Sequence, residues 1–230
     1  MIDLTARLAD VRARIARAAG RAGRDPASIT LVAVTKTFPA ETVRAAAAAG
    51  QVDFGENKVQ EALAKMDAVA LPLRWHLIGH LQSNKAKKAA RFDCIHSIDH
   101  ASLVGRIDEA AAAAGRRVDL LVQVDLAGEA TKFGAREDDL LPIFEAARAA
   151  QATSVVGLML IPPVADDPEE ARPYFRRLNE VRERLLGRGV AGSMLKELSM
   201  GMSHDFEVAI EEGATLVRVG TAIFGDRPYV

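Results

Sequence analysis

Cysteine and aromatic residues are scarce in this chain of 230 residues, which holds one cysteine (Cys94), one tryptophan and two tyrosines. With a single cysteine no intrachain disulfide can form, so the sequence gives no indication of an oxidising compartment. Neither sign of charge is in excess, because the chain has 30 basic and 31 acidic residues and a formal net charge of -1. This balance argues against bulk electrostatic attraction to nucleic acid or to an anionic membrane surface.

Long apolar runs are also missing. No window approaches the ~20 apolar residues that a membrane-spanning helix needs. Residues 1–25 alternate apolar and arginine positions without a central apolar block and include Asp3 and Asp10, which is typical of an amphipathic helix rather than a signal or transit peptide. Since 49% of the residues are hydrophobic, a sizeable core is available and disorder is not expected. We therefore expect a soluble cytoplasmic protein with no membrane partner.

Short apolar runs alternate with helical patterns along the chain, and this alternation predicts a parallel sheet with helical crossovers. The expected strands are 30–35, 52–54, 74–78, 93–97, 118–125, 154–161, 195–199 and 215–219. The expected helices lie near 40–50, 57–68, 82–90, 101–115, 137–151, 168–187 and 204–212. Eight such units fit a closed (β/α)8 barrel of the TIM type better than an open sheet. We predict one domain over residues 1–230, with an additional N-terminal helix at 3–23.

Polar and glycine residues gather where the predicted strands end, which is the face of a barrel that carries chemistry. These positions are Lys36, Gly55-Glu56-Asn57, Gly79-His80, His96-Ser97, Gly128, Lys132, Pro162-Pro163, Ser199-Met200-Gly201, Arg218 and Gly220-Thr221. An amine, a guanidinium, hydroxyls and glycine backbone therefore meet on one rim.

The last two strands are followed by "LSMGMS" and "VRVGTAIFG", which place glycine and a hydroxyl just past each strand, with Ser203 as a candidate helix N-cap. The loops after strands 7 and 8 are the usual phosphate site of a barrel. The alternative is that these are ordinary turn glycines and a cap. Lys36 lies on the neighbouring first strand, where an amine beside a phosphate site would suit a phosphorylated aldehyde held as a Schiff base. Its alternative is a lysine whose ammonium group reaches solvent from a strand end.

The segments "VAVTK", "DFGENKVQE", "WHLIGHLQSNK" and "LSMGMSHDFEVAIEEGATLVRVGTAIFG" together resemble the pyridoxal-phosphate-binding homeostasis proteins, the YggS/PROSC-type family, over nearly the whole chain. The resemblance implies the barrel of the alanine racemase class, with pyridoxal 5'-phosphate (PLP) as cofactor. It also implies a set of cofactor-binding residues, which are Lys36 for the covalent link, Ser199, Gly220 and Thr221 for the phosphate, Arg218 for the pyridine nitrogen, and Met200, Gly201, Asn57 and His76 nearby.

The resemblance implies a role in vitamin B6 homeostasis and leaves two functional classes open, a cofactor holder and a PLP-dependent amino-acid racemase or related enzyme. An arginine cannot in practice give up its proton, so Arg218 would keep the ring nitrogen unprotonated and the ring a weak electron sink. Racemases of this class add a tyrosine base from a separate C-terminal domain, and neither Tyr174 nor Tyr229 is placed by the sequence to oppose Lys36. We expect a monomeric holder of PLP without catalytic residues, whose possible partners are apo forms of PLP enzymes.

Metal binding is not expected, because the spacing of His80, His96 and His100 matches no standard zinc ligand set. Cys94 lies inside a predicted strand and is expected in the core. The basic segment 85–91 (Lys85, Lys87, Lys88, Arg91) is interpreted as a solvated helix face, with attraction of an anionic partner as the alternative.

Overall fold

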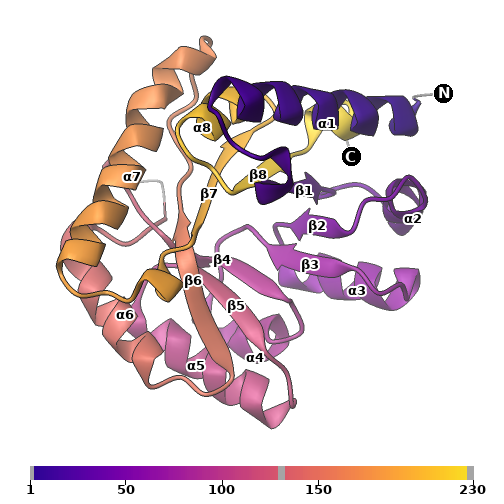
Figure 1. The fold of residues 1–230 in the computed structure, drawn as a ribbon. Helices are drawn as coiled ribbons and strands as arrows, with labels where there is room; N and C mark the ends of the chain where they lie inside the picture. Colours follow the sequence, from indigo (N-terminus) through magenta and orange to yellow (C-terminus); the bar gives the residue numbers. More distant parts are fainter. Residues whose placement is uncertain (1–2, 129–132, 227–230) are drawn as a thin grey trace.

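The computed structural model describes residues 3–128 and 133–226. Eight parallel strands form a closed barrel in chain order, and β8 pairs with β1 (Figure 1). The strands are β1 (Thr30–Val34), β2 (Asp53–Glu56), β3 (Arg74–Leu77), β4 (Cys94–Ile98), β5 (Val118–Gln123), β6 (Thr153–Met159), β7 (Glu197–Met202) and β8 (Leu216–Val219). The predicted (β/α)8 barrel is confirmed. Lys132 and Tyr229, considered in the sequence analysis, lie outside the described residues.

Helices connect the strands and form the outer layer of the barrel. They are α1 (Leu4–Arg21), α2 (Ala40–Ala48), α3 (Val59–Val69), α4 (Ala86–Ala89), α5 (Ala101–Ala113), α6 (Leu140–Arg148), α7 (Arg172–Gly187), α8 (Phe206–Glu211) and α9 (Thr221–Phe224). The short α9 was not predicted. No helix in this described part of the chain is long and apolar enough to cross a membrane.

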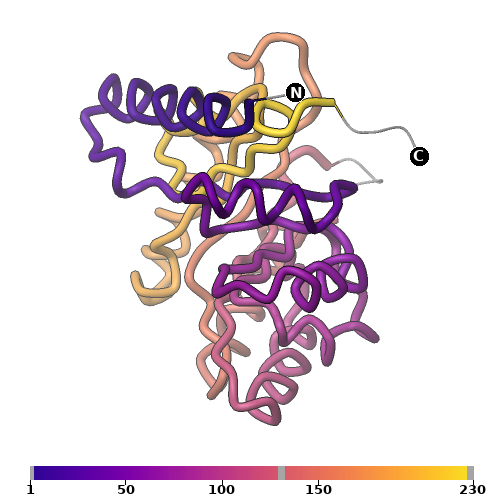
Figure 2. The backbone as a smooth tube through the Cα atoms, turned by 90° about the vertical axis from the view of Figure 1, so that its right-hand side faces the viewer, coloured from indigo at the N-terminus to yellow at the C-terminus, as the bar shows by residue number. Residues whose placement is uncertain are grey.

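The additional helix α1 contacts α8, α9 and α2, so it completes the outer ring of helices where the first and last strands meet. Figures 1 and 2 show it lying along the yellow C-terminal segment. Its buried residues Leu8, Val11 and Ile15 follow the three- and four-residue spacing of an amphipathic helix. Beside this buried stripe, Arg14 forms an ion pair with Glu207 of α8 at 2.9 Å.

The core has two compartments. Between strands and helices lie large, fully buried side chains, which include Phe54, Phe92, Phe144, Phe175 and Phe206. A separate apolar cluster, consisting of Cys94, Leu121 and Met159, comes from neighbouring strands of the barrel. Cys94 is therefore a core residue, as expected, and burial raises the pKa of its thiol well above the ordinary value.

The bounds of β7 differ most from the sequence prediction, which ended that strand at residue 199. The strand instead continues through Gly201 to Met202, and its register against β8 shifts between Ser199 and Met202. Gly201 has φ 91°, and a Cβ at this position would lie 2.9 Å from the Phe206 Cα. This glycine thus serves a bulge inside the strand rather than ending it. As a consequence, Ser199 lies in the middle of β7, not at its carboxyl end.

Candidate functional site

A hollow of about 360 Å³ opens at the carboxyl ends of the strands. It is lined by Val34, Lys36, Asn57, Ile78, Gly79, Ile161, Met202, Ser203, His204, Arg218, Gly220 and Thr221. Five of the nine residues predicted to bind the cofactor are among them, namely Lys36, Asn57, Arg218, Gly220 and Thr221. This is the face on which barrels carry their sites. We call it the rim pocket.

Lys36 follows β1 in a tight turn. Two side chains of α3 form hydrogen bonds with the backbone of this turn. The next residue, Thr37, has φ 71°, a left-handed conformation that is uncommon for a residue with a branched side chain. The Thr37 N–H donates to Glu61 Oε1 at 2.8 Å, and Lys65 Nζ donates to the Thr35 carbonyl at 2.7 Å. Strained turns that are fixed by their surroundings concentrate at functional sites, which supports a functional role for Lys36.

Behind this turn lies a buried ion pair. Glu56 is fully buried, and its Oε1 accepts hydrogen bonds from Lys65 Nζ and from Thr35 Oγ1, each at 2.7 Å. Burial raises the pKa of the Glu56 carboxyl, against the opposing effect of these two donors, and Glu56 Oε2 has no hydrogen-bond partner among the residues that the structure describes. Because buried charges are costly unless paired, Lys65 is needed to keep Glu56 in place. The pair therefore ties α3 to the turn that carries Lys36.

Glycine is required at one further point of the rim pocket. A Cβ on Gly79 would overlap the backbone of Asn57, so the loop after β3 can approach Asn57 only without a side chain there. Both residues line the pocket, as their positions after predicted strands suggested.

Two backbone N–H groups converge on one hydroxyl in the loops after β7 and β8. Ser203 Oγ accepts from Gly220 N at 3.1 Å and from Ala222 N at 3.3 Å. The prediction that Ser203 is a helix N-cap is wrong, because α8 begins after Asp205, whose carboxylate accepts instead from Met202 N at 2.6 Å. Here the two N–H groups are bonded to the Ser203 hydroxyl, and N–H groups and a hydroxyl that converge in this way are of the kind that binds anions. We call these residues, Ser203, Gly220 and Ala222, the anion cradle.

The structure does not place Ser199 in the rim pocket. Its hydroxyl accepts from Arg218 NH1 at 2.6 Å and contacts His96 Nδ1 at 2.9 Å, and the residue is fully buried. Because β7 runs past residue 199, the serine that reaches the pocket is Ser203, which the sequence analysis singled out only as a cap. Met200 joins the hydrophobic core and Gly201 packs against α8, so neither lines the pocket.

Arg218 lies at the inner wall of the rim pocket and is only 4% exposed. Its NH1 donates to Ser199 and its NH2 donates to the Leu160 carbonyl at 2.8 Å. Burial lowers the pKa of this guanidinium to about 10, so it remains charged at neutral pH. Arg218 forms no ion pair within 4.0 Å with any carboxylate of residues 3–128 and 133–226.

His76, predicted near the cofactor ring, lies in the barrel interior and lines a different hollow with Cys94 and Asp119. Possible ligand atoms of His76, Cys94 and His96 lie within 4.8 Å of one another, a cluster that the sequence spacing did not suggest. The ring nitrogens of the two histidines are hydrogen bonded, however, His76 Nδ1 to His96 Nε2 at 2.9 Å. This geometry is that of a hydrogen-bonded pair.

The remaining predicted features lie at the surface. His80 and His100 both contact Asp99 rather than each other. In the basic segment 85–91, the side chains of Lys87 and Lys88 are exposed and Arg91 pairs with Asp67 at 2.6 Å, as a solvated face would.

Burial of His96 predicts a pH dependence of stability. The pKa of His96 is held well below its ordinary value, first by burial and, among its charged neighbours, by the Arg218 guanidinium. Below pH ~6.5 the unfolded chain binds a proton on this histidine that the folded chain does not, so the free energy of unfolding falls by up to about 1.4 kcal/mol per pH unit. Denaturant unfolding of wild type and His96→Gln between pH 7.5 and 5 measures the difference in slope. Parallel curves for the two proteins would contradict the expectation.

Comparison with known proteins agrees with the barrel fold. Residues 6–228 match the family model described as alanine racemase, N-terminal domain. Pyridoxal phosphate homeostasis proteins of Aquifex aeolicus and Pseudomonas aeruginosa are 44% and 45% identical to the chain, over 97% and 100% of its length and 98% of theirs. The chain belongs to the family of pyridoxal phosphate homeostasis proteins, and the resemblance noted in the sequence is confirmed.

Solved structures show the same relationship. PipY of Synechococcus elongatus PCC7942, solved with PLP bound, matches with a TM-score of 0.85 and 39% identity, covering 97% of this chain and 100% of that one. Alanine racemase of Clostridium difficile 630 matches with a TM-score of 0.75 at 15% identity, covering 100% of this chain and 58% of the racemase. The second likeness shows a shared barrel fold.

Proposed function

We propose that this chain holds pyridoxal 5'-phosphate in the rim pocket, as a Schiff base on Lys36, and serves vitamin B6 homeostasis in the cytoplasm. The observation that carries this proposal is that one hollow is lined both by Lys36 and by Ser203 and Gly220 of the anion cradle. An amine fits the aldehyde of this cofactor, and converging N–H groups fit its phosphate. The names of the relatives and the PLP bound to PipY support the same ligand.

The residues of the rim pocket have distinct roles in this proposal. The Lys36 amine attaches the cofactor, and the strained turn after β1 fixes its direction. Ser203, together with the backbone of Gly220 and the side chain of Thr221, binds the phosphate. Arg218 donates to the pyridine nitrogen and, because it stays protonated, keeps that nitrogen unprotonated. Asn57 contributes to the wall beside the loop after β3.

A holder is favoured over an amino-acid racemase by the chemistry of the pocket. When bound, PLP supplies an electron sink for carbanion chemistry, but a ring nitrogen facing Arg218 makes that sink weak. No tyrosine of the described ranges lines the rim pocket, and Tyr174 lies on α7 against the core. We further propose that the protein is a monomer that exchanges cofactor with apo forms of PLP enzymes, with the racemase reading as the alternative.

The phosphate site is tested by comparing PLP with pyridoxal, which has the same ring and aldehyde but no phosphate. Charge-assisted hydrogen bonds contribute roughly 1.5–3 kcal/mol each, so we expect pyridoxal to bind at least about 100-fold more weakly. Ser203→Ala should weaken PLP binding about tenfold and leave pyridoxal binding nearly unchanged. Spectroscopic titration measures all four affinities. Equal affinities of the wild type for both ligands would remove the phosphate site from the proposal.

The absence of racemase activity is tested by incubating the PLP-loaded protein with L-alanine in deuterated water. We expect exchange of the alanine Cα proton far below ordinary enzyme rates, which are on the order of 1 per second or faster. Proton NMR follows the Cα signal, and a chiral separation follows the D-enantiomer. Turnover at ordinary enzyme rates would favour the racemase alternative over the holder.

A further inference from the structure

A chain of buried side chains crosses the barrel from the rim pocket to the opposite end. Arg218 NH1 lies 2.6 Å from Ser199 Oγ, and Ser199 Oγ lies 2.9 Å from His96 Nδ1. The chain continues from His96 Nε2 to His76 Nδ1 at 2.9 Å and ends where His76 Nε2 meets Asp53 Oδ1 at 3.0 Å. The first four of these residues are buried. Every hydrogen-bonding nitrogen of the two imidazole rings is used in the chain.

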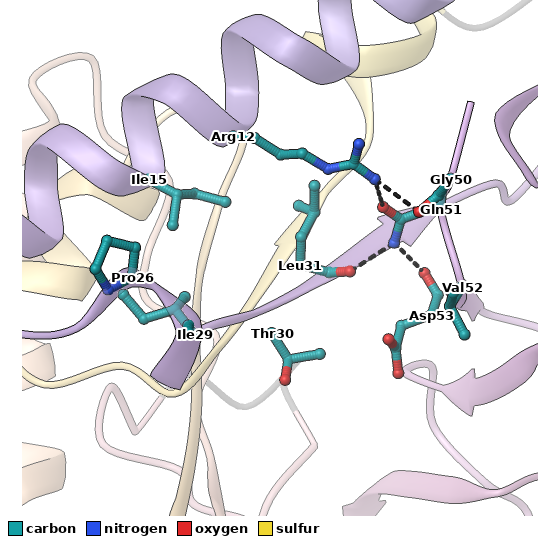
Figure 3. A pocket seen from close by; sticks show the side chains of 11 residues that line it. Arg12, Ile15, Pro26, Ile29, Thr30, Leu31, Gly50, Gln51, Val52 and Asp53 are labelled. Atoms are coloured by element: carbon teal, nitrogen blue, oxygen red, sulfur yellow. Dashed lines mark hydrogen bonds between the residues drawn. The ribbon is translucent and has the colours of Figure 1, made fainter.

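The far end of the chain reaches a second hollow. Asp53 is the first residue of β2, and it lines a hollow of about 430 Å³ together with Thr30, Gln51 and Arg12 (Figure 3). This hollow lies where β1 and β2 begin, whereas the rim pocket lies where the strands end. The chain therefore connects two hollows at opposite ends of the barrel through its interior.

The two ends of the chain fix its direction. A guanidinium can only donate, and a carboxylate can only accept. Ser199 accepts from Arg218, so its single proton is available for His96 Nδ1. His96 then carries its proton on Nε2 and donates to His76 Nδ1, and His76 carries its proton on Nε2 and donates to Asp53. With neutral histidines the opposite direction fails, because a bare His76 nitrogen would face the Asp53 carboxylate across 3.0 Å.

A second arrangement is possible only if His76 is protonated, because its Nδ1–H would then donate to His96 and turn the His96 proton toward Ser199. This arrangement would pair His76 with Asp53, but it would make the buried Ser199 hydroxyl accept from both Arg218 and His96, so that neither could accept the proton of Ser199. A buried hydroxyl whose proton is not used is costly, which favours the direction from Arg218 to Asp53.

We propose that Ser199, His96, His76 and Asp53 are positioning residues that orient the Arg218 guanidinium through a hydrogen-bond chain running in one direction, from Arg218 to Asp53. The chain links the buried positive charge to a carboxylate through four hydrogen bonds in place of a direct ion pair. Arg218 NH1 and NH2 donate hydrogen bonds inside the barrel. The chain thereby fixes the orientation of the planar guanidinium toward the rim pocket. The chain itself needs no ligand, but its effect on PLP rests on the proposed function.

The direction is tested by NMR of the ligand-free protein with 15N-labelled histidine at neutral pH. We expect both His76 and His96 to be neutral with the proton on Nε2. A proton on His96 Nδ1, or a doubly protonated His76, would overturn the proposed direction. Metal analysis of the same sample is included, because zinc bound at His76, Cys94 and His96 would also overturn it. These readouts are made on the wild type and do not depend on a variant that folds.

Coupling along the chain is tested with Ser199→Ala and the matched control Ser203→Ala. We expect Ser199→Ala to shift the ring nitrogen signals of both His96 and His76, although only His96 contacts residue 199, and Ser203→Ala to leave them in place. Shifts confined to His96 would contradict coupling. In PLP titrations, Ser199→Ala should lower affinity about tenfold and change the absorbance of the bound cofactor. If the wild type does not bind PLP at all, the proposed function fails, whereas the NMR result still decides the hydrogen-bond chain.

Discussion

Replacing Lys36 with alanine is expected to abolish the covalent attachment of PLP. The wild-type protein should be yellow when loaded, and borohydride reduction followed by mass mapping should place the adduct on Lys36, because its amine lies in the rim pocket beside the anion cradle. The Lys36→Ala protein should show neither the absorbance band nor the adduct. It should still bind PLP weakly, since the phosphate contacts remain.

Lys87→Ala is the matched control, because Lys87 is an exposed lysine of the basic segment 85–91. Its spectrum and its adduct should equal those of the wild type. An adduct recovered mainly on Lys85 or Lys87 in the wild type, with Lys36 unmodified, would contradict the assignment of Lys36 as the residue that attaches PLP.

Replacing Lys65 with methionine is expected to destabilise the protein by about 3–5 kcal/mol, the usual cost of removing one partner of a buried ion pair. Glu56 would keep its place inside the protein without a cation, and the Thr35 carbonyl would lose its donor. Because the same contacts hold the turn of Lys36, the variant should also bind PLP more weakly. Urea unfolding and PLP titration measure the two effects.

Two companion variants separate charge from packing. Lys58→Met removes an exposed lysine at the start of α3 and should change the free energy of unfolding by no more than about 0.5 kcal/mol. Adding Glu56→Gln to Lys65→Met should recover part of the loss, since a neutral amide is less costly to bury than a carboxylate. The single variant Glu56→Gln is measured as well. If the double variant loses as much unfolding free energy as Lys65→Met and Glu56→Gln lose in sum, the buried charge of Glu56 is not the cause of the loss.

The sequence predicted the barrel well because alternating apolar strands and amphipathic helices follow from local periodicity. Five residues that the sequence assigned to the strand-end rim line the rim pocket, namely Lys36, Asn57, Arg218, Gly220 and Thr221, because they lie within or just after the last residues of the strands. The sequence misplaced the end of β7, because a glycine in a bulge has the same local appearance as a glycine in a turn. The choice of Ser199 as the phosphate ligand came from the resemblance, whereas the serine that lines the rim pocket is Ser203.

The hydrogen-bond chain could not be predicted from the sequence. Asp53, His76, His96 and Ser199 come from four different strands, and only the closure of the barrel brings them into contact. Each looks ordinary in its own segment. The resemblance placed His76 and Ser199 near the cofactor, whereas in the structure they are buried behind Arg218, where we propose that they orient it.

The position of α1 bears on how the chain reaches its native state. The helix precedes all eight strands in the sequence, yet it packs on α8 and α9, and its ion pair joins Arg14 to Glu207 across 193 residues of sequence. The pairing of β1 with β8 is separated by a similar length of chain. Contacts of such long range form slowly, because the intervening chain must be ordered before they are gained. We therefore expect the contacts of α1 with α8 and α9 to form late in folding, after its nearer contact with α2.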